Sequence, residues 1–177
     1  MVAAAQVYML VFRTIHILAA IAWGGTVFLL VLFLQPTAAR VGPAAGPFLR
    51  GLLADARLVD WLLRIAGTTI VAGGFLYWHD MQAYGGFSEF LGQAFGDTMT
   101  FGAICALIAF GIGIIGTAPT IRRLLATGGQ IAQAGDAPPP ELVARSQALT
   151  LRARRLAIGN LVFVTLAAFA MSTARYW

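Results

Sequence analysis

The sequence has no lysine, a single cysteine and few charged residues, and each shortage excludes a class of protein. Charged side chains make up 11% of the 177 residues, less than half of their share in soluble domains. The lone Cys105 lies in an apolar run, and one cysteine excludes an intrachain disulfide. All 12 basic residues are arginine and give a net charge of +5. They cluster beside apolar segments, which indicates membrane topology and not nucleic-acid binding.

Long apolar segments are what the sequence does contain, since 59% of its residues are hydrophobic. Four segments are long enough to cross a hydrocarbon layer about 30 Å thick, namely residues 7–34, 58–78, 98–118 and 156–176. Pro36 and Pro119 are expected to end the first and third, because proline lacks a backbone N–H. The sequence therefore predicts an all-α, single-domain bundle of four transmembrane helices in a lipid bilayer.

Charge differs between the connections. Residues 35–57 and 119–155 hold nine arginines, whereas residues 79–97 hold three acidic residues and no arginine. The positive-inside rule then places the two arginine-rich connections in the cytoplasm, and the loop 79–97 and both termini outside. Gly128-Gly129 and the Gly-Asp-Ala-Pro-Pro-Pro run at 135–140 predict a mobile loop, after which residues 141–155 extend the last helix. Asp60 and Arg64 have the i, i+4 spacing of a local ion pair.

A weak internal repeat accompanies these segments. The first and third spans are followed by P-T-x-x-R, at residues 36–40 and 119–123, and the second and fourth end in Tyr-Trp. A duplicated helical hairpin would explain both matches. The predicted topology does not depend on it.

The two histidines are predicted to lie near one plane at the outer side. His16 and Met99 each stand 20 residues before a proline, or about 30 Å at 1.5 Å per residue. Counting outward from Leu58 along the second span reaches His79, with Met81 close by. This count brings possible metal ligands from three helices to one height.

His16 is the most informative of these residues, because an ionisable residue inside an apolar helix usually marks a cofactor, ion or proton site. Arg13, three residues earlier, suits a haem propionate, and Trp23, two turns deeper, suits the wall of a cofactor pocket. Haem b with His79 or Met99 as second axial ligand is one interpretation. Copper held by imidazoles and thioethers is another, with the ligands His16, His79, Met81 and Met99.

Simpler interpretations stay open for each residue. His16 could bond across helices to a hydroxyl or carbonyl, and Arg13 could extend to the membrane surface or pair with an acidic residue. Trp23 and the methionines are common in packed cores. No catalytic set is predicted, since no nucleophile with a neighbouring base and no phosphate-binding glycine loop is present.

The first span also resembles a known group of bacterial membrane proteins. Residues 13–25 read R-T-I-H-I-L-A-A-I-A-W-G-G: a histidine, a stretch of small residues, then Trp and Gly. This is similar to the opening helix of the CopD copper-resistance membrane domain and the HemJ type of protoporphyrinogen oxidase. The resemblance implies a multi-pass protein of the bacterial inner membrane in which the histidine matching His16 binds haem b or copper. HemJ-like proteins use a lysine that this chain lacks, and CopD-like proteins are usually longer.

Three functions follow as alternatives. The first is a haem b-binding subunit in electron transfer, with haem near the outer face exchanging electrons with a periplasmic carrier or a quinone. The second is a cofactor-free accessory subunit of a respiratory or photosynthetic membrane complex. The third is a CopD-like copper-handling protein. The expected partners are lipid and a larger membrane redox complex or further copies of the chain.

Overall fold

The computed structural model describes residues 2–135 and 137–177, and these residues form helices and turns without a β-strand. Four helical stretches are long and apolar enough to cross a membrane. They run over Gln6–Asp55, Leu58–Ala83, Ala94–Gln133 and Pro140–Tyr176. The predicted all-α fold with four helices long and apolar enough to span a membrane is thus confirmed.

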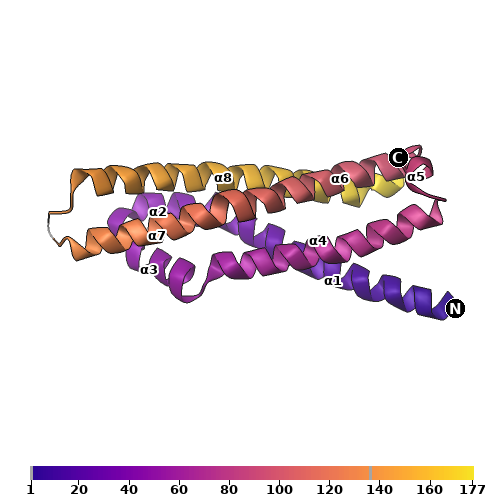
Figure 1. Cartoon of the computed structure of the whole chain (residues 1–177), viewed down its shortest axis with the longest axis horizontal. Coiled ribbons are helices and arrows are strands. Elements are labelled where there is room, and N and C mark those ends of the chain that lie inside the picture. Colours follow the sequence, from indigo (N-terminus) through magenta and orange to yellow (C-terminus); the bar gives the residue numbers. More distant parts are fainter. Residues whose placement is uncertain (1, 136) are drawn as a thin grey trace.

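The long helices form two closely packed pairs. In the first pair α1 (Val2–Leu29) lies along α4 (Leu58–Ala83), and in the second α6 (Ala94–Gly111) lies along α8 (Pro140–Thr173). Figure 1 shows both ends of the chain at one end of the bundle, here called the terminal end. The turn between α7 (Ala118–Gln133) and α8 lies at the opposite end (Figure 1). We call it the arginine-rich end, because residues 35–57 and 119–155 hold nine arginines.

Short helical segments complete the chain. Between α1 and α4 lie η1 (Leu30–Leu34), α2 (Gln35–Val41), η2 (Gly42–Ala45), α3 (Gly46–Arg50) and η3 (Gly51–Asp55). Further along are α5 (Phe87–Leu91), η4 (Ile112–Thr117) and η5 (Ala174–Tyr176). The segments from α2 to η3 fold back at the arginine-rich end, beside the start of α4 (Figure 1).

The two prolines do not end their helices, contrary to the prediction. Each stands near the start of a new α-helical segment that directly follows a π-helical one: Pro36 follows η1 and Pro119 follows η4. The amide of the residue before each proline bonds to a carbonyl five residues back, Gln35 to Leu30 and Ala118 to Gly113. The wider π turn accommodates the proline ring and its missing donor, so the helical path continues.

The third connection is also more regular than predicted. α7 runs through Gly128 and Gly129 to Gln133, and α8 begins at Pro140. Two glycines cost a helix about 1 kcal/mol each relative to alanine, but α7 is supported by packing along α8. The predicted mobile loop therefore shrinks to the turn between these helices, where Asp136 lies outside the described residues. The predicted extension of the last helix over residues 141–155 is confirmed.

Asp60 pairs with different arginines from the one predicted. Its carboxylate lies 3.0 Å from Arg57 and 3.3 Å from Arg122 of α7, which joins the two helix pairs at the arginine-rich end. Arg64 instead places its guanidinium over the Trp61 ring, 5.4 Å from the centroid. Arg57 caps α4 in a left-handed conformation (φ 51°), which turns its side chain toward Asp60.

Candidate functional site

His16 lies in the interface between α1 and α4 and is half-buried. Its Nδ1 is 2.9 Å from the backbone carbonyl oxygen of Thr69. A carbonyl only accepts, so Nδ1 carries a proton, and in the neutral imidazole Nε2 then has the free lone pair. The simpler interpretation, a histidine that bonds across helices to a carbonyl, is confirmed for this nitrogen.

A glycine makes room for the His16 ring. A Cβ atom added at Gly73 would lie 2.7 Å from Cε1 and 2.9 Å from Nδ1 of His16. Any side chain at position 73 would therefore push the imidazole off α4. The next residue, Gly74, has nothing within 4 Å of the same added atom. The contact with the imidazole is specific to Gly73.

His79 belongs to an aromatic cluster nearer the terminal end. Its ring stacks on Tyr8 at 6.0 Å, and the Tyr8 hydroxyl bonds to the carbonyl of Phe75. Phe12 packs between Tyr8 and Phe75, at 4.7 and 4.8 Å. His79 Nδ1 is 3.7 Å from the Asp80 carboxylate, too far for a hydrogen bond.

The two histidines do not lie at a common height. His79 is level with Tyr8, eight residues before His16, which is about 12 Å along the helix axis. Met99 lies beside Thr100, whose hydroxyl is 2.7 Å from the Tyr77 hydroxyl, so Met99 is closer in height to His79 than to His16. The π segments η1 and η4 do not alter these relative heights, because they lie nearer the arginine-rich end.

The remaining predicted residues are placed as follows. Arg13 is exposed, and among the described residues it makes no ion pair. Met81 is half-buried near the end of α4. Trp23 is 5% exposed and packs in the core with Val27 and Ala109. In the described part of the chain no three His, Cys, Asp or Glu side chains gather as a metal-binding group.

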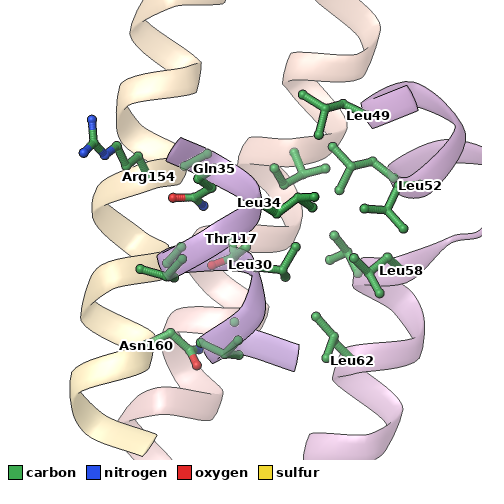
Figure 2. Close-up of a pocket in the computed structure, with 18 of the residues that line it drawn as sticks. Leu30, Leu34, Gln35, Leu49, Leu52, Leu58, Leu62, Thr117, Arg154 and Asn160 are labelled. Atoms are coloured by element: carbon green, nitrogen blue, oxygen red, sulfur yellow. The ribbon is translucent and has the colours of Figure 1, made fainter. Parts of the chain in front are cut away.

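A chamber of about 720 Å³ opens between the two helix pairs toward the arginine-rich end. Trp23 forms part of its wall, together with leucines of α3, η3 and α4. Figure 2 shows Leu49, Leu52, Leu58 and Leu62 along one side, and Gln35, Thr117 and Asn160 toward α8 on the other. The chamber has the size and mostly apolar lining of a small-molecule pocket. His16 is not among its lining residues.

Three polar atoms on the chamber wall have no hydrogen-bond partner among the described residues. They are Gln35 Oε1, Thr117 Oγ1 and Asn160 Oδ1. These three oxygens are buried within the wall and are not exposed to the chamber, so they do not mark a place where a molecule in the chamber forms hydrogen bonds.

Sequence reasoning missed this chamber, although a signal was present. Asn160 is the only asparagine and stands inside an apolar span, and polar residues in such spans usually face the bundle interior. Gln35 likewise precedes the proline of the first span. The prediction concentrated on histidines and methionines, whereas the polar residues that line the chamber are Gln35, Arg40, Thr117, Thr150, Arg154 and Asn160.

No protein-family model, curated protein or solved structure matches this chain. The resemblance of residues 13–25 to the CopD and HemJ groups therefore stays a prediction.

Proposed function

We propose that this multi-pass membrane protein is a haem b-binding subunit in electron transfer, with His16 as an axial ligand. The observation that carries the proposal is the bond from His16 Nδ1 to the Thr69 carbonyl at 2.9 Å. Metal-ligating histidines almost always donate their second ring N–H to a carbonyl or carboxylate, which fixes the ring and leaves the other nitrogen for the metal. When bound, haem supplies one-electron chemistry.

The residues around His16 supply one axial ligand for haem and not two. Gly73 leaves room for the imidazole against α4, and Arg13 is exposed one turn away on α1, where it can pair with a propionate. His79 and Met99 lie nearer the terminal end than His16. His16 is therefore assigned as the ligand, and His79 as part of the aromatic cluster.

Visible spectra of three purified proteins test this assignment. The wild-type protein should show a b-type band in the reduced-minus-oxidised spectrum, and His16→Ala should lose it. His79→Ala is the matched control, since it removes the other imidazole and should keep the band. A band unchanged in His16→Ala, or no band in the wild type, would reject the proposal.

The proposal also includes the orientation of the chain in the membrane and a duplicated helical hairpin. Arginine dominates one end of the bundle, which supports a cytoplasmic position for that end and an outer position for both termini in a bacterial inner membrane. In both P-T-x-x-R sequences a π segment ends two residues before the proline. This shared irregularity supports a duplicated hairpin.

A cofactor-free accessory subunit is the second candidate, and the surface of α1 favours it. In the most apolar window of the first span only 11% of the residues are buried, against 22% in the third span. Ile17, Leu18 and Ile21 are 47%, 63% and 65% exposed. A partner helix could cover this face in place of lipid. Purification in mild detergent as a stoichiometric complex without chromophore or metal would support this candidate over haem binding.

A further inference from the structure

We infer that the chamber between the two helix pairs holds an acyl chain of an anionic phospholipid, whose phosphate is bound by Arg40 and Arg154. These arginines are the only charged residues that line the chamber in the described part of the chain, and they come from separate elements, α2 and α8. The inference does not depend on haem binding at His16, which does not line the chamber.

The two arginines are available to a ligand. Both are exposed, and neither pairs with an acidic residue within the described chain. Arg40 donates only from Nε, to the Pro36 carbonyl at 3.4 Å, so its two terminal nitrogens are left to bind another group. Asp60, at the same end of the bundle, is held instead by Arg57 and Arg122. Two positive charges beside an apolar chamber favour an anion that carries an apolar body.

The chamber is about as deep as one membrane leaflet. Along the first span its lining runs from Trp23 to Arg40, which is 17 residues or about 25 Å at 1.5 Å per residue. A leaflet with its head groups is about 20 Å thick. With Arg40 at the head-group level, Trp23 therefore lies close to the bilayer centre, and an acyl chain fits between these two levels.

The position of Arg154 separates the charged end of the ligand from its apolar end. In Figure 2 its side chain extends away from Leu52 and Leu62, which lie on the other side of the chamber. Arginine commonly covers apolar surface with its stem and keeps its charge at the edge. A head group bound there stays at the edge of the chamber, and the acyl chain packs on the leucines. Guanidinium groups bind phosphate through parallel hydrogen bonds, and one phosphate has oxygens enough for two of them.

Other occupants satisfy only part of this arrangement. A free phosphate matches the two charges but leaves about 720 Å³ of mostly apolar chamber without a ligand. A neutral lipid fills the chamber but leaves the arginines without an anion. Basic pockets between transmembrane helices bind anionic lipid head groups in other membrane proteins. An anionic phospholipid matches both the charges and the apolar lining.

Native mass spectrometry of the delipidated protein in detergent tests the inference with two lipids. Dioleoyl phosphatidylglycerol and dioleoyl phosphatidylcholine have the same acyl chains and differ in net charge. The wild type should bind the anionic lipid at least about fivefold more tightly, since each arginine near an anionic head group contributes roughly this factor. Arg40→Gln and Arg154→Gln should each lower the affinity for the anionic lipid about fivefold and leave that for phosphatidylcholine nearly unchanged.

Arg155→Gln is the matched control for these variants. Arg155 is exposed and adjacent to Arg154 on α8, but it does not line the chamber. This variant loses the same charge and should keep the wild-type affinity for phosphatidylglycerol. An equal loss in Arg155→Gln and Arg154→Gln would show general attraction to the arginine-rich end and overturn the inference. Equal affinity of the wild type for the two lipids also overturns it, as does tighter binding of oleate, which would make a fatty acid the occupant.

Quenching of Trp23 fluorescence locates the acyl chain. Trp23 is 5% exposed and lines the chamber, so a lipid on the outer surface of the bundle does not reach it. In a variant with phenylalanine at Trp61, Trp78 and Trp177, phosphatidylglycerol with brominated chains should quench Trp23 saturably. Adding Arg154→Gln should shift this saturation to about fivefold higher lipid concentration. Lipid adducts in the mass spectrum without quenching of Trp23 would place the lipid outside the chamber and overturn the inference. None of these results bears on the His16 spectrum.

Discussion

At the scale of single residues, substitutions at two neighbouring glycines of α4 distinguish the effect of packing on stability from the effect of helix propensity. Gly73 touches the His16 ring, whereas Gly74 has open space around it. Gly73→Ala should destabilise the protein by about 1–3 kcal/mol, because the added methyl group displaces the imidazole and breaks its bond to Thr69. It should also weaken haem retention. Thermal unfolding and the visible spectrum measure the two effects.

Gly74→Ala is the control for this prediction. A helical glycine replaced by alanine in open space should gain up to about 1 kcal/mol, with the spectrum unchanged. Equal destabilisation by both variants would contradict the proposed seat for the imidazole on Gly73.

The burial of Trp23 could be predicted from the sequence, because it follows from the apolar helix. The heights of His16 and His79, counted along the predicted helices, were wrong. Trp23 was expected to line a cofactor pocket at His16 or to pack in the core. It packs in the core at 5% exposed, and the chamber that it also lines does not include His16. The count that brought His16 and His79 together assumed regular helices ending at prolines and level with one another. It could not include the offset between α1 and α4, which depends on contacts such as Tyr8 with His79.

At the scale of elements, the pair α6 and α8 is held together by small residues. A Cβ atom at Gly102 would lie 2.9 Å from Met171 Cγ and 3.3 Å from the Ala167 carbonyl oxygen. Gly102→Ala should therefore force the helices apart and cost about 1–3 kcal/mol, measured as a lower midpoint of thermal unfolding in detergent.

Gly111, on the same helix α6, provides the comparison because nothing lies within 4 Å of its added Cβ. Gly111→Ala should leave the midpoint unchanged or raise it. A drop as large as that of Gly102→Ala would show that helix propensity or lipid contact, and not the α6–α8 contact, governs the effect.

The number of spanning elements could be predicted from the sequence, but their interruptions could not. Four apolar segments of sufficient length were evident, because hydrophobicity and length are local properties. The π segments before Pro36 and Pro119 were not, since a proline ends one helix and only bends another according to the packing around it. Gly128 and Gly129 likewise do not end α7, because the packing of α7 on α8 stabilises this helix.

At the scale of the whole molecule, the arrangement in Figure 1 makes the proposed orientation testable, because both ends of the chain lie opposite the α7–α8 turn. In a Cys105→Ala background, a single cysteine at exposed Ser88 or exposed Gln133 reports one end each. A membrane-impermeant thiol reagent should label Ser88→Cys in intact cells, and Gln133→Cys only after lysis. The reverse pattern would invert the proposed topology.

At the scale of the whole molecule, the His16 contact and the chamber lie one after the other along α1. The His16 imidazole lies between α1 and α4, and Trp23, seven residues or about 10 Å further along α1, lines the chamber. The two sites share no lining residue, so each can be lost without the other.

Iron and copper content of the purified wild-type protein, measured together by elemental analysis, tests the central claim most directly. The account predicts iron stoichiometric with the chain, extractable as haem b, and no copper. Copper without iron, or neither metal in a folded preparation expressed with sufficient haem supply, would contradict a haem site at His16.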